Sequence, residues 1–206
     1  CLLILALGLE AQSKSPAFVQ YIEKYKDLAI RQQIKYNVPA AITMAQGLLE
    51  SSAGTSELAT TANNHFGIKC TSDWQGRTVT KDDDKAGECF RCYANINDSY
   101  EDHSLFLLRP RYKSLFALPL GDYKAWAHGL KACGYATDPS YPEKLIRLIE
   151  LYDLQALTFD KNLLAGGFVS EGDTIWSEPQ SDIIGHAAQG GIRDYVYPPM
   201  EDLELY

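Results

Sequence analysis

The segment 39–51 constrains the fold of this chain more than any other. Its sequence, PAAITMAQGLLES, places apolar side chains on nearly every face of a predicted helix. A helix that is apolar all round belongs in the interior of a domain, with other elements packed on several sides. A single carboxylate, Glu50, stands near its end, where the run Ser51 to Gly54 favours termination. The core is therefore predicted to form around this helix, with Glu50 at its edge.

Helical periodicity recurs along much of the rest of the chain. Apolar residues return at helical spacing after Pro16, which suits a first helical position, and Asn37 is predicted to cap the helix that follows it. The predicted helices, including one short helical turn, cover residues 16–37, 39–51, 55–62, 98–109, 122–133 and 140–153. Residues 74–93 combine β-prone and turn-forming residues and are typical of a two- or three-stranded β-hairpin. We therefore expect an α+β fold, mainly α, in which the hairpin forms a small second lobe beside a cleft.

Length and composition indicate how the chain is divided. Its 206 residues, 46% of them hydrophobic and 22% charged, suit one globular domain with a short appendage. We assign that domain to residues 16–157 and expect 158–206, which lack a sustained period, to be a tail or a partial second module. The apolar run over residues 1–11 resembles the core of a truncated signal peptide. A buried strand or helix start is the alternative, and a lipidated Cys1 is another.

Charge and hydropathy exclude two classes of partner. The formal net charge is -8, and no cluster of Lys and Arg provides the basic surface that nucleic-acid binding needs. No segment is apolar for long enough to span a bilayer. We expect a protein that acts as a monomer, binds no nucleic acid and has no membrane span.

The cysteines favour one disulfide. An exported chain would enter a compartment where disulfides persist. The pair Cys89 and Cys92 has C-x-x-C spacing, but a zinc site would need a second pair or two suitably spaced histidines. We predict no metal site and a bridge between Cys70 and Cys89 across the hairpin. The states of Cys92 and Cys133 stay open.

Glu50 is the first candidate for chemistry. A glutamate held against apolar helix neighbours has its ionised form desolvated, which raises its pKa and lets it donate a proton near neutral pH. Glycoside hydrolysis needs such an acid together with a group that stabilises or captures the cationic sugar centre. The alternative is a solvated glutamate at a helix end. The hairpin adds further carboxylates: Asp82, Asp83, Asp84 and Glu88. The alternative for the run Asp82 to Asp84 is a solvated turn or a cation site.

Several strings, in the right order, resemble one family. They include AITMAQGLLESSAGTSELA followed by NNHFGIKC, then SDWQG, FRCY, DSYEDHSLFL and GYATDPSYPEKL. Over about residues 18 to 155 the chain resembles the glucosaminidase family of bacterial peptidoglycan hydrolases, glycoside hydrolase family 73. The resemblance implies a lysozyme-like fold of two lobes and endo-β-N-acetylglucosaminidase activity. The bond cut would be the β-1,4 link between N-acetylglucosamine and N-acetylmuramic acid.

The resemblance also implies roles for residues. Glu50 matches the family's catalytic glutamate. The second acidic residue belongs to the hairpin, where Asp83 ranks first and Asp82 and Glu88 are alternatives. The cleft tyrosines match Tyr135, which could orient the acetamido group of the substrate, and Tyr141. If the second carboxylate is distant, that acetamido group could itself be the internal nucleophile.

Two smaller features have competing interpretations. Phe66 could stack on a sugar ring, although an aromatic residue in a compact motif is more often part of the core. Asn64 could hydrogen-bond sugar, although asparagines in turns usually bond to their own backbone. The histidines, His65 and His103 among them, are expected to be structural.

The functional expectation is a secreted peptidoglycan hydrolase, in the periplasm or at the cell wall, that needs no cofactor. One alternative is a lysozyme or lytic transglycosylase that acts on the muramic acid side. The other is a non-catalytic wall-binding module.

Overall fold

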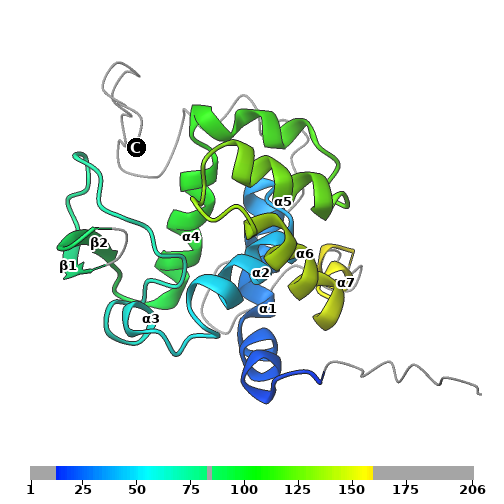
Figure 1. The fold of residues 1–206 in the computed structure, drawn as a ribbon, viewed down its shortest axis with the longest axis horizontal. Helices are drawn as coiled ribbons and strands as arrows, with labels where there is room; N and C mark the ends of the chain where they lie inside the picture. The colour runs from blue at the N-terminus through cyan, green and yellow to red at the C-terminus, as the bar shows by residue number, and fades with distance from the viewer. Residues whose placement is uncertain (1–12, 83–84, 160–206) are drawn as a thin grey trace, which may run out of the picture.

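The computed structural model describes residues 13–82 and 85–159, and the other residues are left aside. Figure 1 shows a hairpin and a short helix on one side and several helices on the other, with α2 and α4 between them. In chain order the elements are α1 (Pro16–Tyr36), α2 (Ala40–Glu50), α3 (Glu57–Ala62), β1 (Arg77–Lys81), β2 (Glu88–Cys92), α4 (Ile96–Leu107), the 3₁₀ helix η1 (Pro110–Ala117), α5 (Tyr123–Ala132), α6 (Tyr141–Tyr152) and α7 (Gln155–Thr158). The expected mainly helical α+β fold is confirmed.

Helix α2 lies at the centre of the core. Every residue from Ala40 to Leu48 is buried, as its apolar surface predicts. Helices α1, α5, α6 and α7 all pack against it, so it is covered on several sides. Only its last two residues, Leu49 and Glu50, are half-buried. Glu50 therefore lies at the edge of the core.

The connection between α1 and α2 differs from the prediction. Asn37 does not cap α2. It ends α1 instead, with a φ of 58° and its N–H donated to the Gln33 carbonyl. Asparagine tolerates this left-handed conformation better than most residues, so it suits a helix C-terminus as well as an N-terminus. Pro39 occupies the position before α2.

The hairpin has two strands. β1 and β2 pair antiparallel, with Arg77 opposite Cys92 and Lys81 opposite Glu88. Lys69 adds an isolated bridge to Phe90, which brings the preceding loop alongside β2. The predicted Cys70–Cys89 disulfide is confirmed and joins that loop to the hairpin, while Cys92 and Cys133 are unpaired.

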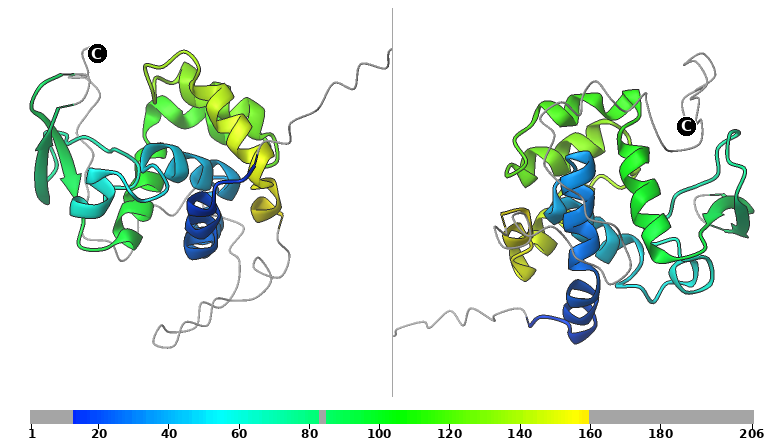
Figure 2. Two further views of the ribbon diagram at one scale, coloured as in Figure 1. Left: turned by 60° about the horizontal axis from the view of Figure 1, so that its bottom comes forward. Right: turned by 180° about the vertical axis from the view of Figure 1, so that it is seen from behind.

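An ion pair between a buried arginine and a partly buried aspartate attaches the hairpin to α4. Arg91 of β2, only 2% exposed, donates to both oxygens of Asp102 at 2.9 and 3.0 Å. Tyr93 donates to the same carboxylate at 2.6 Å. Arg91 also reaches the Thr71 hydroxyl at 2.6 Å and lies against the Trp74 ring. Figure 2 shows the hairpin beside α4 from two further directions.

The last described helix belongs to the packed fold. Thr158 is 2% exposed, and its hydroxyl accepts the Ala41 N–H at 3.2 Å. Its carbonyl accepts the side-chain amide of Gln33 at 3.0 Å. The predicted signal-peptide run over 1–11 and nearly all of the predicted tail lie outside the described residues.

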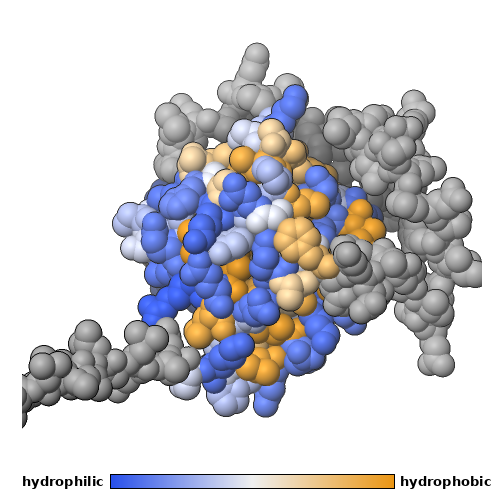
Figure 3. Space-filling model, turned by 90° about the vertical axis from the view of Figure 1, so that its right-hand side faces the viewer, coloured by the Kyte–Doolittle hydropathy of each residue, from blue (hydrophilic) through white to orange (hydrophobic). Residues whose placement is uncertain are grey.

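The surface is mixed in character. Figure 3 shows one face on which apolar residues are interspersed with polar ones. None of the helices in the described part of the chain combines the length and apolar character needed to cross a bilayer.

Candidate active site

Glu50 ends the buried helix α2 and meets a tyrosine from α6. The Tyr141 hydroxyl donates a hydrogen bond to Glu50 Oε1 at 2.8 Å. Tyr141 is 3% exposed, so this bond forms at the boundary between core and surface. The two residues are 91 positions apart in the chain, and packing of α6 against α2 brings them together. Two of the residues predicted for the site are therefore in contact.

Tyr135 lies next to this pair. Its ring stacks on that of Tyr141, with centroids 5.7 Å apart and an interplanar angle of 25°. Burial raises the pKa of the Tyr135 phenol well above its usual range, and the negative charge of Glu50 raises it further. Within the described residues the hydroxyl has no hydrogen-bond partner. The structure thus brings Glu50, Tyr135 and Tyr141 together.

A left-handed turn begins two residues after Glu50. Ser52, Ala53 and Gly54 have φ values of 50°, 54° and 79°. The left-handed conformation costs non-glycine residues roughly 1–2 kcal/mol each, and such strain is concentrated at functional sites. The buried Ser51 hydroxyl fixes the turn, because it donates to the Gly47 carbonyl at 2.5 Å and accepts the Gly54 N–H at 2.7 Å. The chain therefore turns sharply away from Glu50.

A cluster of aromatic side chains supports the same end of α2. The Tyr21 hydroxyl is 2.9 Å from His65 Nδ1 and 3.0 Å from the Tyr100 hydroxyl. Gly47 makes room for it, since a Cβ at that position would lie 2.9 Å from the Tyr21 oxygen. Burial lowers the pKa of His65 to about 4, with a smaller contribution from Lys24, so this imidazole is neutral at ordinary pH. The prediction of a structural role for His65 fits this environment.

Asn64 and Phe66 lie in the interior. They are 1% and 2% exposed. The Asn64 amide donates to the carbonyls of Ile68 and Arg91, and its oxygen accepts the Ile68 N–H. Phe66 stacks on His103 with centroids 3.9 Å apart. Direct contact of either side chain with sugar does not fit this burial, and the contacts of both side chains are with other residues of the fold.

The hairpin carboxylates are held within their own lobe. Glu88 accepts hydrogen bonds from Lys69 at 2.8 and 2.9 Å, which lower its pKa. Asp82 accepts the Gly87 N–H at 2.7 Å. Asp83 and Asp84 lie outside the described residues. Of the described candidates for the second acid, Asp82 and Glu88 therefore bond to residues of the hairpin and the loop beside it.

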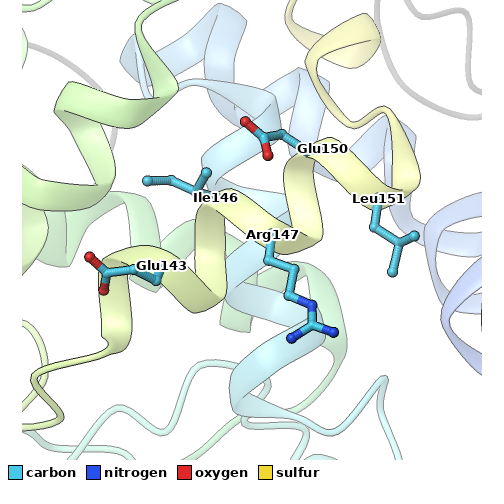
Figure 4. Close-up of a pocket in the computed structure, with 5 residues that line it drawn as sticks. All are labelled: Glu143, Ile146, Arg147, Glu150 and Leu151. Atoms are coloured by element: carbon cyan, nitrogen blue, oxygen red, sulfur yellow. The ribbon is translucent and has the colours of Figure 1, made fainter. Parts of the chain in front are cut away.

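Two surface hollows lie elsewhere. One follows α6 alone and is lined by Glu143, Ile146, Arg147, Glu150 and Leu151, which Figure 4 shows on one helix. Glu50 is not among them. The second lies between the hairpin and α4, with Trp74, Tyr93 and Asp102 in its lining. In the part of the chain that the structure describes, no group of three or more His, Cys, Asp or Glu residues could hold a metal ion.

Two residues behind Glu50 were not predicted as part of the site. Gln46 Nε2 donates to the Tyr141 hydroxyl at 3.0 Å, and Gln46 Oε1 lies 3.1 Å from His103 Nε2. Gln46 and His103 are fully buried. A signal for Gln46 was present in the sequence, because an amide in an otherwise apolar helix, one turn before the candidate acid, needs partners.

Comparisons with known proteins agree on a single family. The glucosaminidase family model, described as mannosyl-glycoprotein endo-beta-N-acetylglucosaminidase, matches residues 26–154. The chain is 35% identical over 170 residues to the exo-glucosaminidase LytG of Bacillus subtilis, covering 72% of this chain and 58% of that protein. It is 32% identical over 151 residues to the peptidoglycan hydrolase FlgJ of Vibrio parahaemolyticus, covering 67% and 48%. The chain thus spans about half the length of these relatives.

Solved structures show the same fold. The catalytic domain of the autolysin Auto from Listeria monocytogenes aligns with a TM-score of 0.60 at 29% identity, covering 70% of this chain and 89% of that one. The glycoside hydrolase domain of FlgJ from Salmonella typhimurium aligns with a TM-score of 0.55 at 26% identity, covering 72% and 96%. These neighbours are lysozyme-like peptidoglycan hydrolase domains. With a family model that matches most of the described residues, the chain belongs to the glucosaminidase family.

Proposed function

We propose that this chain is a peptidoglycan hydrolase that cleaves the β-1,4 bond between N-acetylglucosamine and N-acetylmuramic acid, with Glu50 as its general acid. The observation that carries the proposal is the placement of Glu50. In a chain of the glucosaminidase family, it ends a buried helix and accepts a hydrogen bond from Tyr141. The relatives named as glucosaminidase and peptidoglycan hydrolases support the substrate class.

The chemistry begins with proton transfer. Protonated Glu50 donates to the glycosidic oxygen, and the sugar centre becomes cationic as the bond breaks. The hydrogen bond from Tyr141 strengthens as Glu50 becomes negative, because bonds to ionised acceptors are stronger than those between neutral groups. The stacked rings of Tyr135 and Tyr141 form an aromatic wall beside the carboxylate.

A second group then stabilises or captures the cationic centre, after which water adds to the sugar carbon and a proton returns to Glu50. We rank Asp83 first among the hairpin carboxylates, with Asp82 and Glu88 as alternatives. If none of them comes close, the acetamido group of the substrate attacks instead, and we propose that the buried Tyr135 hydroxyl, which has no partner among the described residues, becomes accessible and orients it. The three hairpin variants with alanine at these positions separate the routes: substrate-assisted cleavage retains activity in all three.

Replacement of Glu50 by glutamine tests the general acid. The amide keeps the size of the side chain but has no acidic proton, so we expect clearing of a cell-wall suspension to fall at least about a hundredfold. Binding to insoluble peptidoglycan should persist. The matched control is Glu57→Gln, on the exposed side of α3. If the unaltered protein binds walls and never clears them, the wall-binding alternative is correct.

Product analysis identifies the bond. Reducing ends of N-acetylglucosamine support the proposal, whereas anhydromuramic ends or reducing ends of muramic acid would assign the chain to the transglycosylase or lysozyme class. The size of the first products separates internal cleavage from removal of terminal sugars. We propose internal cleavage. Early release of single sugars would instead match the exo-glucosaminidase name of one relative.

The proposed substrate implies export. Peptidoglycan lies outside the cytoplasm, and we infer that residues 1–11 act as a signal peptide and that the protein works in the periplasm or at the cell wall. Fractionation of cells that produce the chain tests this inference. Retention in the cytoplasm would contradict it.

A further inference from the structure

A line of buried hydrogen bonds leads from the interior of the domain to Glu50. His103 of α4 contacts Gln46 of α2, Gln46 contacts Tyr141 of α6, and Tyr141 contacts Glu50, at 3.1, 3.0 and 2.8 Å. Exposed fractions of 0%, 0% and 3% show that His103, Gln46 and Tyr141 are buried. Three helices therefore meet in one polar chain that ends on the candidate acid.

The three hydrogen bonds of this line all donate in the direction of Glu50. A glutamine amide has one accepting and one donating end. Because Gln46 Oε1 faces the imidazole, His103 Nε2 carries the hydrogen. Because Gln46 Nε2 faces Tyr141, the phenol oxygen accepts, and its own hydrogen is directed to Glu50. The amide orientation thus decides whether Tyr141 donates to Glu50 or accepts from it.

The surroundings of His103 hold this direction. Its ring is stacked on Phe66, with an interplanar angle of 17°, and the Tyr135 ring meets it edge-on at 6.2 Å. Burial lowers the pKa of His103 to about 3, so the ring is neutral and carries one N–H. Nδ1 has no partner among the described residues. If these hydrogen bonds ran in the opposite direction, the hydrogen of His103 would sit on Nδ1. This would bury a donor with no acceptor, which proteins avoid more strictly than an unused acceptor.

We propose that His103 and Gln46 are positioning residues: they fix the direction of the hydrogen bond that Tyr141 donates to Glu50 and so hold the carboxylate in one orientation. Neither residue touches the substrate. Their effect on catalysis rests on the proposed function, but the direction of the hydrogen bonds does not. Without them, the Tyr141 hydroxyl can turn its hydrogen away from Glu50.

Kinetics of two His103 variants test the proposal. His103→Phe keeps an aromatic ring on Phe66 and removes the donor, whereas His103→Gln keeps an N–H at the position of Nε2. We expect His103→Phe to lower kcat about tenfold or more with KM nearly unchanged, since it misplaces the acid without altering a sugar contact. His103→Gln should recover most of kcat. Equal losses in both variants, in step with lost thermal stability, would indicate a merely structural role.

A double variant shows through which residue His103 acts. Tyr141→Phe removes the last donor of the chain, so adding His103→Phe to it should cause no further loss in kcat. Residues that act through a shared partner are non-additive, and residues that act independently multiply their effects. Multiplied losses would overturn the proposal.

Titration of Glu50 provides a measurement that needs no turnover. The ¹³C signal of its carboxyl group is followed by NMR in folded protein. Loss of a donor to the ionised form favours protonation, so the midpoint should move to higher pH in Tyr141→Phe and His103→Phe but not in His103→Gln.

The surrounding charges stay constant in this comparison. Burial holds the pKa values of Tyr135 and Tyr141 well above their usual range, and the hairpin carboxylates are the same in every variant. An unmoved midpoint in His103→Phe would overturn the proposal. A moved midpoint in a protein that hydrolyses no peptidoglycan would refute the proposed function and leave the positioning role intact.

Discussion

At the scale of single residues, Asp102 makes the contacts that join the hairpin to the helices. It accepts both bonds from Arg91 and one from Tyr93, and the Arg91 side chain is 3% exposed. A buried guanidinium that loses its partner remains charged in a poorly solvated place, which is strongly destabilising. Removing Asp102 is therefore expected to cost more stability than the attraction between the two charges contributes.

Asp102→Asn should lower the free energy of unfolding by about 3 kcal/mol, because Arg91 would stay buried without a compensating charge. Urea denaturation measures the change. The control is Glu150→Gln, which breaks an exposed contact with Lys124 at 3.0 Å and should leave stability unchanged within error. Equal effects of the two substitutions would contradict the conclusion that Asp102 compensates the charge of a buried Arg91.

Residues differ in how far the sequence predicts them. Glu50 follows from the apolar helix it ends and from the motif around it. Tyr141 follows from the motif, but its contact with Glu50 depends on the packing of two helices distant in sequence. Asn64 and Phe66 lie in the same kind of motif and are buried. A sequence motif therefore shows which part of the chain forms the site. Burial in the structure then distinguishes the residues that can contact a ligand from those that support them.

At the scale of elements, patterns that arise within one helix or strand were predictable. The periodic segments became α1, α2, α4, α5 and α6, and the turn-rich stretch became the hairpin. The 3₁₀ helix η1 was not predicted, since its eight residues give too short a window for periodicity. Asn37 was assigned to the wrong helix because asparagine suits both a helix start and a helix end.

Gly47→Ala tests how tightly α2 is packed. Alanine favours a helix by about 1 kcal/mol over glycine. Its methyl group, however, would lie 2.9 Å from the Tyr21 oxygen and 3.2 Å from that of Tyr100. Overpacking a core typically costs about 1–3 kcal/mol, so we expect net destabilisation in thermal unfolding. In a Tyr21→Phe background the cost should shrink, because the nearest oxygen is gone. A stabilised Gly47→Ala protein would show that this part of the core is loose.

At the scale of the whole molecule, the two-lobed fold was predictable from the position of the hairpin between helical segments and from the family resemblance. The contacts that hold the two lobes together could not be predicted from the sequence. They involve the Arg91–Asp102 pair and the buried aromatic cluster, whose members are far apart in sequence. Two buried neutral histidines, His65 and His103, are a further property that only the folded structure reveals.

These histidines should make folding sensitive to acid. Burial lowers their pKa values from 6.5 to about 4 and about 3. Between pH 6.5 and those values the unfolded chain binds protons that the folded chain excludes, so stability is complete above pH 6.5 and falls as pH decreases. The free energy of unfolding then falls by up to about 1.4 kcal/mol per pH unit for each histidine.

Unfolding measured at intervals between pH 7 and pH 4.5 checks this expectation, since the carboxylates with lowered pKa values act mainly below that range. His103→Gln should make the decline shallower. The exposed His128 provides the control, and His128→Gln should leave the slope unchanged. A slope that is the same in all three proteins would exclude His103 as its source.

The Cys70–Cys89 bond encloses the whole of β1 and the hairpin tip within a covalent ring, because its ends are 19 residues apart in the chain. A protease that cuts a single peptide bond anywhere inside this ring would not divide the molecule. The two fragments would stay linked through sulfur, with β2 still attached to α4 by Arg91. Such a nicked protein would migrate as one species on a non-reducing gel and as two after reduction. One cut in this lobe would therefore leave Glu50 and the helices that position it in one covalent assembly.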